Sequence, residues 1–237
     1  MQDLTLGGLC RFSSVDWPGR LCAVLFVQGC PWRCGYCHNP GLQPRQSTSL
    51  NWREVLSWLP SRRGLLDGVV FSGGEPLLDA GLPEALRQVR SLGFGTGLHT
   101  AGIYPDRLQG LLPLLDWVGL DIKAALDDAG SYARLTGAAA AWADASRSLD
   151  LVLDAHRVRA LAYECRTTWH PDYMGEAELL RLARQLRSRE VRHWVLQEAR
   201  PTPQWRPRQG GLDGEGRALL AQRLREALPQ LQLRMVA

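Results

Sequence analysis

LCAVLFVQGCPWRCGYCH, residues 21–38, places an unbroken apolar run directly before three closely spaced cysteines. The run at residues 21–27 is typical of a strand that is buried on both faces. Five more short apolar runs follow along the chain, at residues 68–71, 95–98, 117–120, 158–163 and 194–196. Segments with helical periodicity separate these runs, so strands and helices are expected to alternate.

The helical segments carry apolar residues three and four positions apart, with start and stop signals at their ends. In residues 82–89, Pro83 lies early and Gly93 follows the last apolar position. Asn51 is the expected N-cap of another helix, and Pro113 is expected to shorten the helix that begins near Pro105. We therefore expect helices over residues 52–59, 82–89, 142–152, 179–186 and 220–227.

Six strand–helix alternations predict an α/β fold with a parallel sheet and right-handed crossovers. A closed barrel usually needs eight such units, so we expect a sheet curved into a partial (β/α)6 barrel. This single domain is expected to span residues 1–200. Residues 201–237 are expected to add a C-terminal loop, a helix and a short strand that pack on the same domain.

The composition of the 237 residues is that of an ordinary globular protein, with 45% hydrophobic and 22% charged residues. No apolar run is long enough to span a membrane, and the first residues lack the features of a secretory signal, so we expect a cytoplasmic protein without a membrane partner. The formal net charge of +4 is too small to imply a nucleic-acid partner. Lys123 is the only lysine among 28 basic residues, which indicates a position that needs a compact ammonium group.

Polar and reactive residues follow each predicted strand. Beyond the cysteines after the first strand, they lie at residues 72–76, 99–102, 121–123, 164–166 and 197–198. Strand ends of one kind meet at one edge of a parallel sheet, so these segments are expected to converge on an active site. The general polarity of loops explains Gln197 and Glu198 equally well.

The cysteines at positions 30, 34 and 37 allow four interpretations. A zinc site would need His38 as a fourth ligand beside Cys37, which is difficult for adjacent residues. The C-x-x-C-H pattern at Cys34 also fits haem attachment, and Cys34 and Cys37 alone could form a redox dithiol. A three-thiolate iron–sulfur cluster would leave one iron open for another ligand. The remaining Cys10, Cys22 and Cys165 are interpreted as small buried hydrophobic residues.

The C-x3-C-x2-C spacing, with Tyr36 before its third cysteine, resembles the cluster loop of radical S-adenosylmethionine enzymes, and residues 73–76 (GGEP) resemble their amino-binding motif. Within this family the chain is similar to the activating enzymes of glycyl-radical proteins, and most to activators of anaerobic ribonucleoside-triphosphate reductases. This likeness runs from about residue 6 to residue 200. The stretches that carry it are VDWPG (15–19), QGC (28–30), CHNP (37–40), DIK (121–123) and RTT (166–168).

The resemblance implies a 4Fe-4S cluster held by Cys30, Cys34 and Cys37, with S-adenosylmethionine at the open iron. Reductive cleavage of this cofactor would give a 5′-deoxyadenosyl radical that removes a hydrogen atom from a glycine of a partner enzyme, so no protein side chain is expected to be catalytic. An external reductant such as flavodoxin is implied, because no cysteine-rich insertion is present. The cofactor-binding residues implied are Tyr36, His38, Asn39, Gly73, Gly74, Glu75, His99, Thr100, Asp121, Lys123, Arg166 and Gln197.

One departure from the pyruvate formate-lyase activator concerns the residues after the third strand. That activator has an Asp-Thr-Asn-Gly pattern whose Asp helps to hold a monovalent cation, whereas this chain has His99-Thr-Ala-Gly102. Histidine is a poor ligand for a hard cation, so the cation site is expected to be absent or altered. The Arg-rich residues 181–208, with Trp194 and Trp205, form either a partner contact or a solvated surface.

Three alternatives to this function remain at the level of sequence. The chain could activate another glycyl-radical enzyme, or act on a small molecule by the same radical chemistry. A non-enzymatic module that holds a metal or transfers electrons through its cysteines is the alternative from a different class. Such a module would not cleave the cofactor and would not need Glu75 or Lys123.

Overall fold

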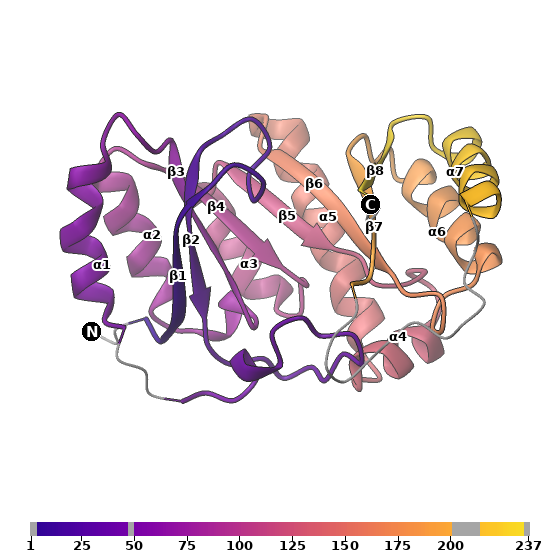
Figure 1. Cartoon of the computed structure of the whole chain (residues 1–237), viewed down its shortest axis with the longest axis horizontal. Helices are drawn as coiled ribbons and strands as arrows, with labels where there is room; N and C mark the ends of the chain where they lie inside the picture. Colours follow the sequence, from indigo (N-terminus) through magenta and orange to yellow (C-terminus); the bar gives the residue numbers. More distant parts are fainter. Residues whose placement is uncertain (1–3, 47–49, 201–213, 235–237) are drawn as a thin grey trace. The chain divides into compact units, whose positions relative to one another are not determined.

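A computed structural model describes residues 4–46, 50–200 and 214–234 (Figure 1). Eight strands form one mostly parallel sheet in the order β1 to β8, and the sheet does not close. The strands are β1 (Leu6–Ser13), β2 (Cys22–Val27), β3 (Gly68–Gly73), β4 (Gly95–Thr100), β5 (Trp117–Asp121), β6 (Ala162–Trp169), β7 (Trp194–Glu198) and β8 (Leu231–Arg234).

Seven α-helices lie between or after these strands in the described ranges. They are α1 (Trp52–Trp58), α2 (Leu82–Ser91), α3 (Pro105–Leu111), α4 (Ala129–Thr136), α5 (Ala141–Arg159), α6 (Glu176–Ser188) and α7 (Gly214–Ala227). Asn51 caps α1 as expected, because its side chain accepts a hydrogen bond from the backbone of Arg53. A short 3-10 helix at Leu112–Leu114, which contains Pro113, follows α3. No helix in the described part of the chain is long and apolar enough to cross a membrane.

The predicted alternation is confirmed for five of the six strands, and the strand predicted at residues 158–163 is misplaced. Residues 158 and 159 belong to the last turn of α5, where Val158 is 85% exposed. Ala160 adopts a positive φ of 56° beyond the helix end, and β6 begins only at Ala162. Residues 164–166 therefore lie inside the strand and not after it.

Two elements were not expected from the sequence. Strand β1 pairs antiparallel with β2, while β3 pairs parallel with β2 on one side and with β4 on the other. Helix α4 is short and was missed because its apolar pattern spans only two turns.

The predicted C-terminal helix and short strand are present as α7 and β8. The predicted loop at residues 201–213 lies outside the described residues, and the division of the chain near residue 200 stays a prediction.

The chain forms two compact units, of which the first comprises Met1–Pro31, Asn39–Gly119 and Ser148–Tyr163. Its core contains Trp17, whose ring stacks on Trp117 with centroids 5.9 Å apart. A Cβ atom on Gly68, Gly95 or Gly97 would lie only 2.8 to 3.1 Å from the Trp17 ring. Strands β3 and β4 thus use glycine where the indole of the β1–β2 connection packs against them.

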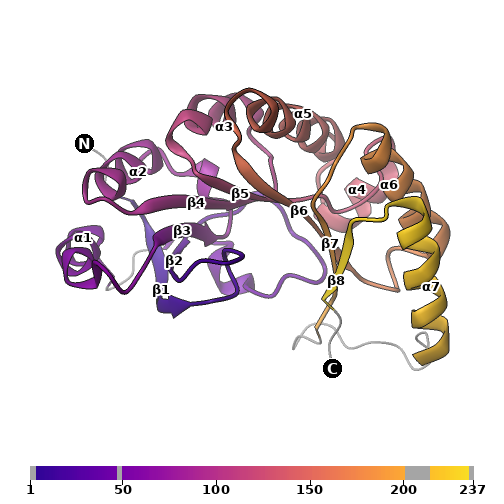
Figure 2. The same cartoon turned by 90° about the horizontal axis from the view of Figure 1, so that it is seen from above.

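The second unit comprises Trp32–His38, Leu120–Arg147 and Glu164–Ala237. Here α6 and α7 lie side by side (Figures 1 and 2). Trp194 on β7 is fully buried and donates a hydrogen bond to Thr167 Oγ1 at 2.9 Å. Trp194 therefore cannot be part of a partner surface, and Trp205 lies outside the described residues.

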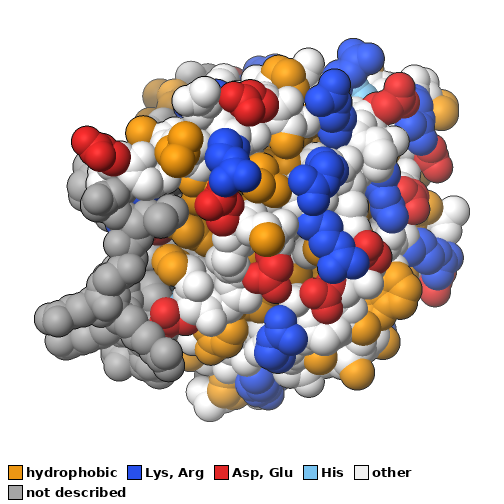
Figure 3. All heavy atoms as spheres, turned by 90° about the vertical axis from the view of Figure 1, so that its right-hand side faces the viewer, with side chains coloured by type: hydrophobic (Ala, Val, Ile, Leu, Met, Phe, Trp, Pro, Cys, Tyr) orange, Lys and Arg blue, Asp and Glu red, His pale blue; other side chains and the backbone are white. Residues whose placement is uncertain are grey.

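The surface that carries α6 and α7 is charged with both signs. Figure 3 shows basic and acidic side chains interspersed on this face, without one large basic patch. Arg181 pairs with Asp127 at 2.8 Å, and Arg223 of α7 pairs with Glu176 of α6. The described part of the Arg-rich stretch therefore has the character of a solvated helix surface.

Candidate active site

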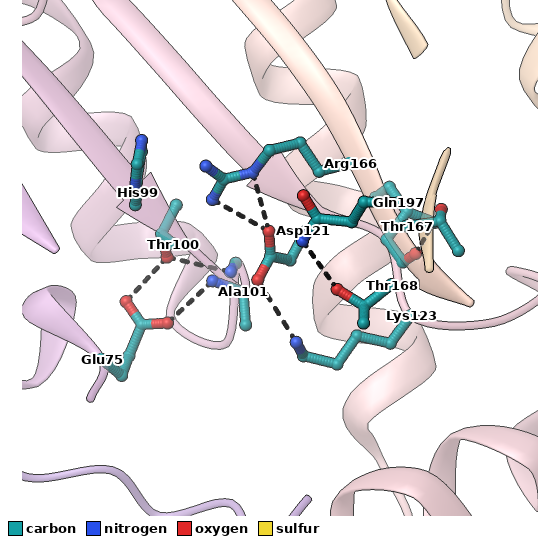
Figure 4. Close-up of polar contacts among 12 residues, drawn as sticks. Glu75, His99, Thr100, Ala101, Asp121, Lys123, Arg166, Thr167, Thr168 and Gln197 are labelled. Atoms are coloured by element: carbon teal, nitrogen blue, oxygen red, sulfur yellow. Dashed lines mark hydrogen bonds and ion pairs between the residues drawn. The ribbon is translucent and has the colours of Figure 1, made fainter. Parts of the chain in front are cut away.

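Glu75 lies in the turn after β3 and is fully buried in the first unit. Its carboxylate accepts hydrogen bonds from Thr100 Oγ1 at 2.7 Å and from the backbone N–H of Ala101 at 2.9 Å (Figure 4). It also accepts one from the backbone N–H of Leu77 at 3.1 Å. A buried carboxylate is tolerated only with such partners. Glu75 thereby fixes the turn after β3 to the loop after β4.

The two glycines of this turn allow close approach between backbones. A Cβ on Gly73 would lie 2.3 Å from the carbonyl oxygen of Val27, and one on Gly74 would lie 2.4 Å from that of Gly29. Gly73 also has a φ of +121°, which side-chain-bearing residues rarely adopt. The backbone N–H of Glu75 donates to Gly29 O at 2.8 Å. The turn after β3 therefore packs directly on the loop after β2, which was not evident from the motif.

His99, at the penultimate position of β4, is held through both ring nitrogens. Its Nε2 lies 2.8 Å from the carbonyl oxygen of Asp16, and its Nδ1 lies 3.2 Å from Ser72 Oγ. A carbonyl oxygen only accepts, so Nε2 carries a proton and donates it. The ring also meets the edge of Trp117, with centroids 5.2 Å apart. His99 thus joins β4 to the β1–β2 connection.

Asp121, Lys123 and Arg166 form a charged cluster in the second unit (Figure 4). Asp121 Oδ1 accepts from Arg166 Nε at 3.0 Å and Nη2 at 2.9 Å, and its Oδ2 lies 3.3 Å from Lys123 Nζ. Burial opposes the lysine charge, yet the neighbouring Tyr36 and Asp121 groups hold the pKa of Lys123 well above its ordinary value. The three groups together carry one surplus positive charge, which suits an anionic ligand.

The same unit holds the loop with Cys34 and Cys37. Lys123 Nζ lies 5.8 Å from the ring centroid of Tyr36, and the backbone N–H of Cys37 donates to Cys34 O at 3.1 Å. Burial raises the pKa of the Cys34 thiol, while the charge of Lys123 opposes this. The buried Tyr36 hydroxyl has no hydrogen-bond partner within the described residues.

The remaining predicted residues are Gln197 and His38 in the second unit and Asn39 in the first. Gln197 at the end of β7 donates to Thr168 Oγ1 at 2.9 Å. His38 is exposed, and burial of part of its ring, with the charges of Arg200 and Lys123, lowers its pKa. Asn39 is exposed, and its carbonyl accepts from the N–H of Leu42.

The chemistry of the donor set fits an iron–sulfur cluster. Cys30, Cys34 and Cys37 are all free thiols, and thiolates are the preferred ligands of such clusters. No group of three or more His, Cys, Asp or Glu side chains within residues 4–46, 50–200 and 214–234 is arranged around a single metal ion. A cubane cluster takes one thiolate per iron, so its ligands do not share one ion.

Sequence reasoning missed three aromatic residues near this loop. The Tyr132 hydroxyl accepts from the backbone N–H of Lys123 at 3.2 Å. The ring centroids of His170 and Tyr173 lie 5.7 and 6.4 Å from that of Tyr36. His170 directly follows the true end of β6, so the rule that reactive residues follow strands would have found it, had the strand been placed correctly.

The fold and the site define an α/β protein with a cysteine-bearing loop after its first parallel strand and a glycine-rich turn after the next. The family model described as the radical SAM superfamily matches residues 24–163, more than half of the chain. The chain belongs to this superfamily.

Three known proteins illustrate the likeness. A Methanocaldococcus jannaschii protein, provisionally named as a glycyl-radical enzyme activating enzyme, is 25% identical over 83% of this chain and 80% of its own. The pyruvate formate-lyase-activating enzyme of Clostridium pasteurianum is 38% identical over 52% of this chain and 53% of its own, so the match spans about half of each. A radical SAM methyltransferase from Sphaerobacter thermophilus shares the fold, with a TM-score of 0.70, 17% identity, and coverage of 99% of this chain and 78% of its own.

Proposed function

We propose that this chain is an activating enzyme that cleaves S-adenosylmethionine at a 4Fe-4S cluster and generates a glycyl radical on an anaerobic ribonucleoside-triphosphate reductase. The observation that carries this proposal is the position of Lys123, 5.8 Å from the Tyr36 ring and 3.3 Å from Asp121. A largely buried cation thus lies beside Tyr36, one of the two residues between Cys34 and Cys37. The Methanocaldococcus relative, matched over most of both chains, supports the glycyl-radical class.

In this proposal the cysteines bind the cluster, and the charged cluster of Asp121, Lys123 and Arg166 binds the methionine part of S-adenosylmethionine. Cys30, Cys34 and Cys37 each hold one iron, and Lys123 with Arg166 attracts the carboxylate of the methionine part while Asp121 orients both cations. When bound, the cluster supplies the electron that splits S-adenosylmethionine into methionine and a 5′-deoxyadenosyl radical, which takes hydrogen from the partner's glycine.

The other proposed ligands bind the remaining groups of S-adenosylmethionine. Gly73, Gly74 and Glu75 present backbone carbonyls and a carboxylate to its amino group, and Thr100 holds Glu75 in place. Tyr36 and His38 are assigned to the adenosine side and Asn39 to the support of the loop, whereas His99, Thr100 and Gln197 are proposed as cofactor-binding residues without an assigned group.

The first experiment follows cofactor cleavage. The protein is reconstituted anaerobically with iron and sulfide, reduced with dithionite and given S-adenosylmethionine, and 5′-deoxyadenosine is measured by chromatography. Wild type and Cys10→Ala are expected to form product, whereas Cys34→Ala is expected to form none. A fully loaded wild-type cluster without product would overturn the enzyme proposal in favour of the metal or electron-transfer module.

A second experiment identifies the partner. Wild type is incubated with purified anaerobic ribonucleoside-triphosphate reductase or with pyruvate formate-lyase, and the glycyl radical is detected by electron paramagnetic resonance. The signal is expected on the reductase, with reduced flavodoxin able to replace dithionite. A radical on pyruvate formate-lyase alone would indicate the other activator, and cleavage without a radical on either would favour a small-molecule substrate.

The prediction that the monovalent cation site is absent or altered is tested in the cofactor-cleavage assay. Because both ring nitrogens of His99 face protein groups, activity is expected to be equal in sodium, potassium and bulky organic-cation buffers. A clear requirement for sodium or potassium would contradict this expectation.

A further inference from the structure

The segment after β6 packs two aromatic side chains against the cysteine loop. The ring centroids of His170 and Tyr173 lie 4.6 Å apart in a T-shaped contact, and both rings contact Tyr36. All of these residues belong to the second unit. His170 is 1% exposed and Tyr173 is partly exposed, so the contact reaches from the interior toward solvent.

Gly35, the other residue between Cys34 and Cys37, lies directly against Tyr173. A Cβ atom on Gly35 would lie 2.3 Å from the Tyr173 hydroxyl oxygen and 3.0 Å from the ring carbon that carries it. Glycine at this position therefore allows the phenol ring to rest on the backbone of the loop. Both residues between the two cysteines are thus contacted by the segment after β6, although Gly35 itself stays exposed.

This segment is itself held firmly. The backbone N–H groups of Tyr173 and Met174 donate to the carbonyl of His170 at 2.9 and 3.0 Å. The indole N–H of Trp169 donates to Met174 O at 2.9 Å. The turn at residues 169–174 is thus closed on itself before it meets the loop, which makes it a rigid support.

We propose that His170 and Tyr173 form an aromatic clamp that sets the conformation of the Gly35–Tyr36 segment and thereby positions the Cys34 and Cys37 sulfurs for the cluster. The cluster role of these sulfurs rests on the proposed function, whereas the clamp itself is a property of the protein without cofactor. Because the Tyr36 hydroxyl has no hydrogen-bond partner in the described part of the chain, ring contacts hold this side chain.

The clamp is tested first on the protein without cluster, by alkylating its thiols with iodoacetamide and measuring each cysteine by mass spectrometry. In Tyr173→Ala, Cys34 and Cys37 are expected to react about fivefold faster than in wild type, because local order is lost. Phe12→Ala, which truncates an exposed aromatic residue of β1, is the control and is expected to leave both rates unchanged. Tyr173→Phe retains the ring and is expected to restore the wild-type rates.

Gly35→Ala provides a second, independent variant. Its added methyl group displaces the Tyr173 ring, so Gly35→Ala, Tyr173→Ala and the double variant are all expected to show the same alkylation rates. Additive effects in the double variant would overturn the clamp, as would Tyr173→Ala rates equal to those of wild type. If wild type proves unable to cleave S-adenosylmethionine, the alkylation results still decide the clamp, so the two proposals fail separately.

A third measurement uses the reconstituted protein. Removal of the Tyr173 ring, which lies against Gly35, is expected to increase the exposure of the loop to water, and solvent exposure is one determinant of cluster potential. Tyr173→Ala is expected to retain less iron per chain, and its remaining cluster is expected to be reduced at a more positive potential in a titration followed by electron paramagnetic resonance. Tyr173→Phe is expected to match wild type in both. An unchanged potential and iron content in Tyr173→Ala would contradict the positioning role.

Discussion

Glu75 accepts three hydrogen bonds in the interior of the first unit, from Thr100, Ala101 and Leu77. The sequence motif indicated a carboxylate that meets a ligand ammonium group. The structure adds that this carboxylate also braces two loops of the protein. The bracing role of Glu75 contributes to stability even without a ligand. Variants of Glu75 can therefore be tested for stability in the protein without cofactor, separately from ligand binding.

Glu75→Gln is expected to destabilise the protein without cofactor by about 1 to 3 kcal/mol, because an amide NH2 group must then face a hydrogen-bond donor. Urea unfolding followed by circular dichroism measures this loss. Glu84→Gln, at an exposed pair with Arg87 on α2, is the matched control and is expected to change the free energy of unfolding by less than about 0.5 kcal/mol. Equal stability of both variants would refute the bracing role of Glu75.

Asp116 gives a pH-dependent contribution to stability. Burial raises its pKa, but hydrogen bonds from the Thr96 backbone and from Arg90 outweigh this and leave the pKa below its ordinary value of 3.8. Because the pKa is lower in the folded state, the ionised carboxylate stabilises the fold at pH values above the unfolded-state pKa. This contribution is lost as the pH falls through the folded-state pKa. The free energy of unfolding of Asp116→Asn is therefore expected to depend less on pH than that of wild type below about pH 4. Urea unfolding at pH 6 and pH 3 tests this, with Asp154→Asn at an exposed position of α5 as control.

Among the elements, α2 and β6 show what the sequence can and cannot define. Helix α2 was predicted closely, because Pro83 and Gly93 mark its ends and four apolar residues mark its buried face. At β6, the β-branched Val158 resembled the start of a strand, although α5 continues through this position and leaves Val158 85% exposed. The misplaced strand end hid His170 and Tyr173. The cysteines, Glu75 and Lys123 could be singled out from the sequence because their motifs are local, and their roles as ligands stay predictions.

Helix α4 is capped by Asp128 at its start and contacts the cysteine loop at its end. The Asp128 side chain accepts from the Ser131 backbone N–H at 2.9 Å, and the carbonyl of Thr136 in the last turn accepts from the Arg33 N–H at 2.8 Å. Asp128→Ala is expected to cost about 1 kcal/mol of stability and to speed hydrogen exchange at Arg33. Asp128→Asn retains a capping oxygen and is expected to behave like wild type. Unchanged exchange at Arg33 in Asp128→Ala would show that α4 does not support the loop.

At the scale of the whole molecule, neither unit is one continuous piece of chain. The first unit includes Ser148–Tyr163 in addition to Met1–Pro31 and Asn39–Gly119, and Ser148 Oγ donates to Gly102 O at 2.7 Å. Strands β5 and β6 contribute residues to both units. The units are therefore regions of one fold and not domains that could be separated by a single cut.

A fragment of residues 1–119 is accordingly expected to lack cooperative thermal unfolding, because it omits part of the first unit. The intact chain is expected to unfold in one transition in the absence of cofactor. Circular dichroism melts of the two proteins measure both expectations. A sharp, reversible transition in the fragment would show that residues 148–163 are dispensable.

The single lysine gives this chain an unusual chemical property. Lys123 carries the only side-chain amine in the sequence, and 12% of its side chain is exposed, beside Asp121 and Tyr36. An amine-selective label attached to a side chain can therefore report on one position, without any engineered substitution. The fraction of chains acylated at Lys123, measured by the mass of the intact chain, reports whether a molecule is bound beside this residue. A lower fraction in the presence of an added small molecule would indicate that the compound binds there.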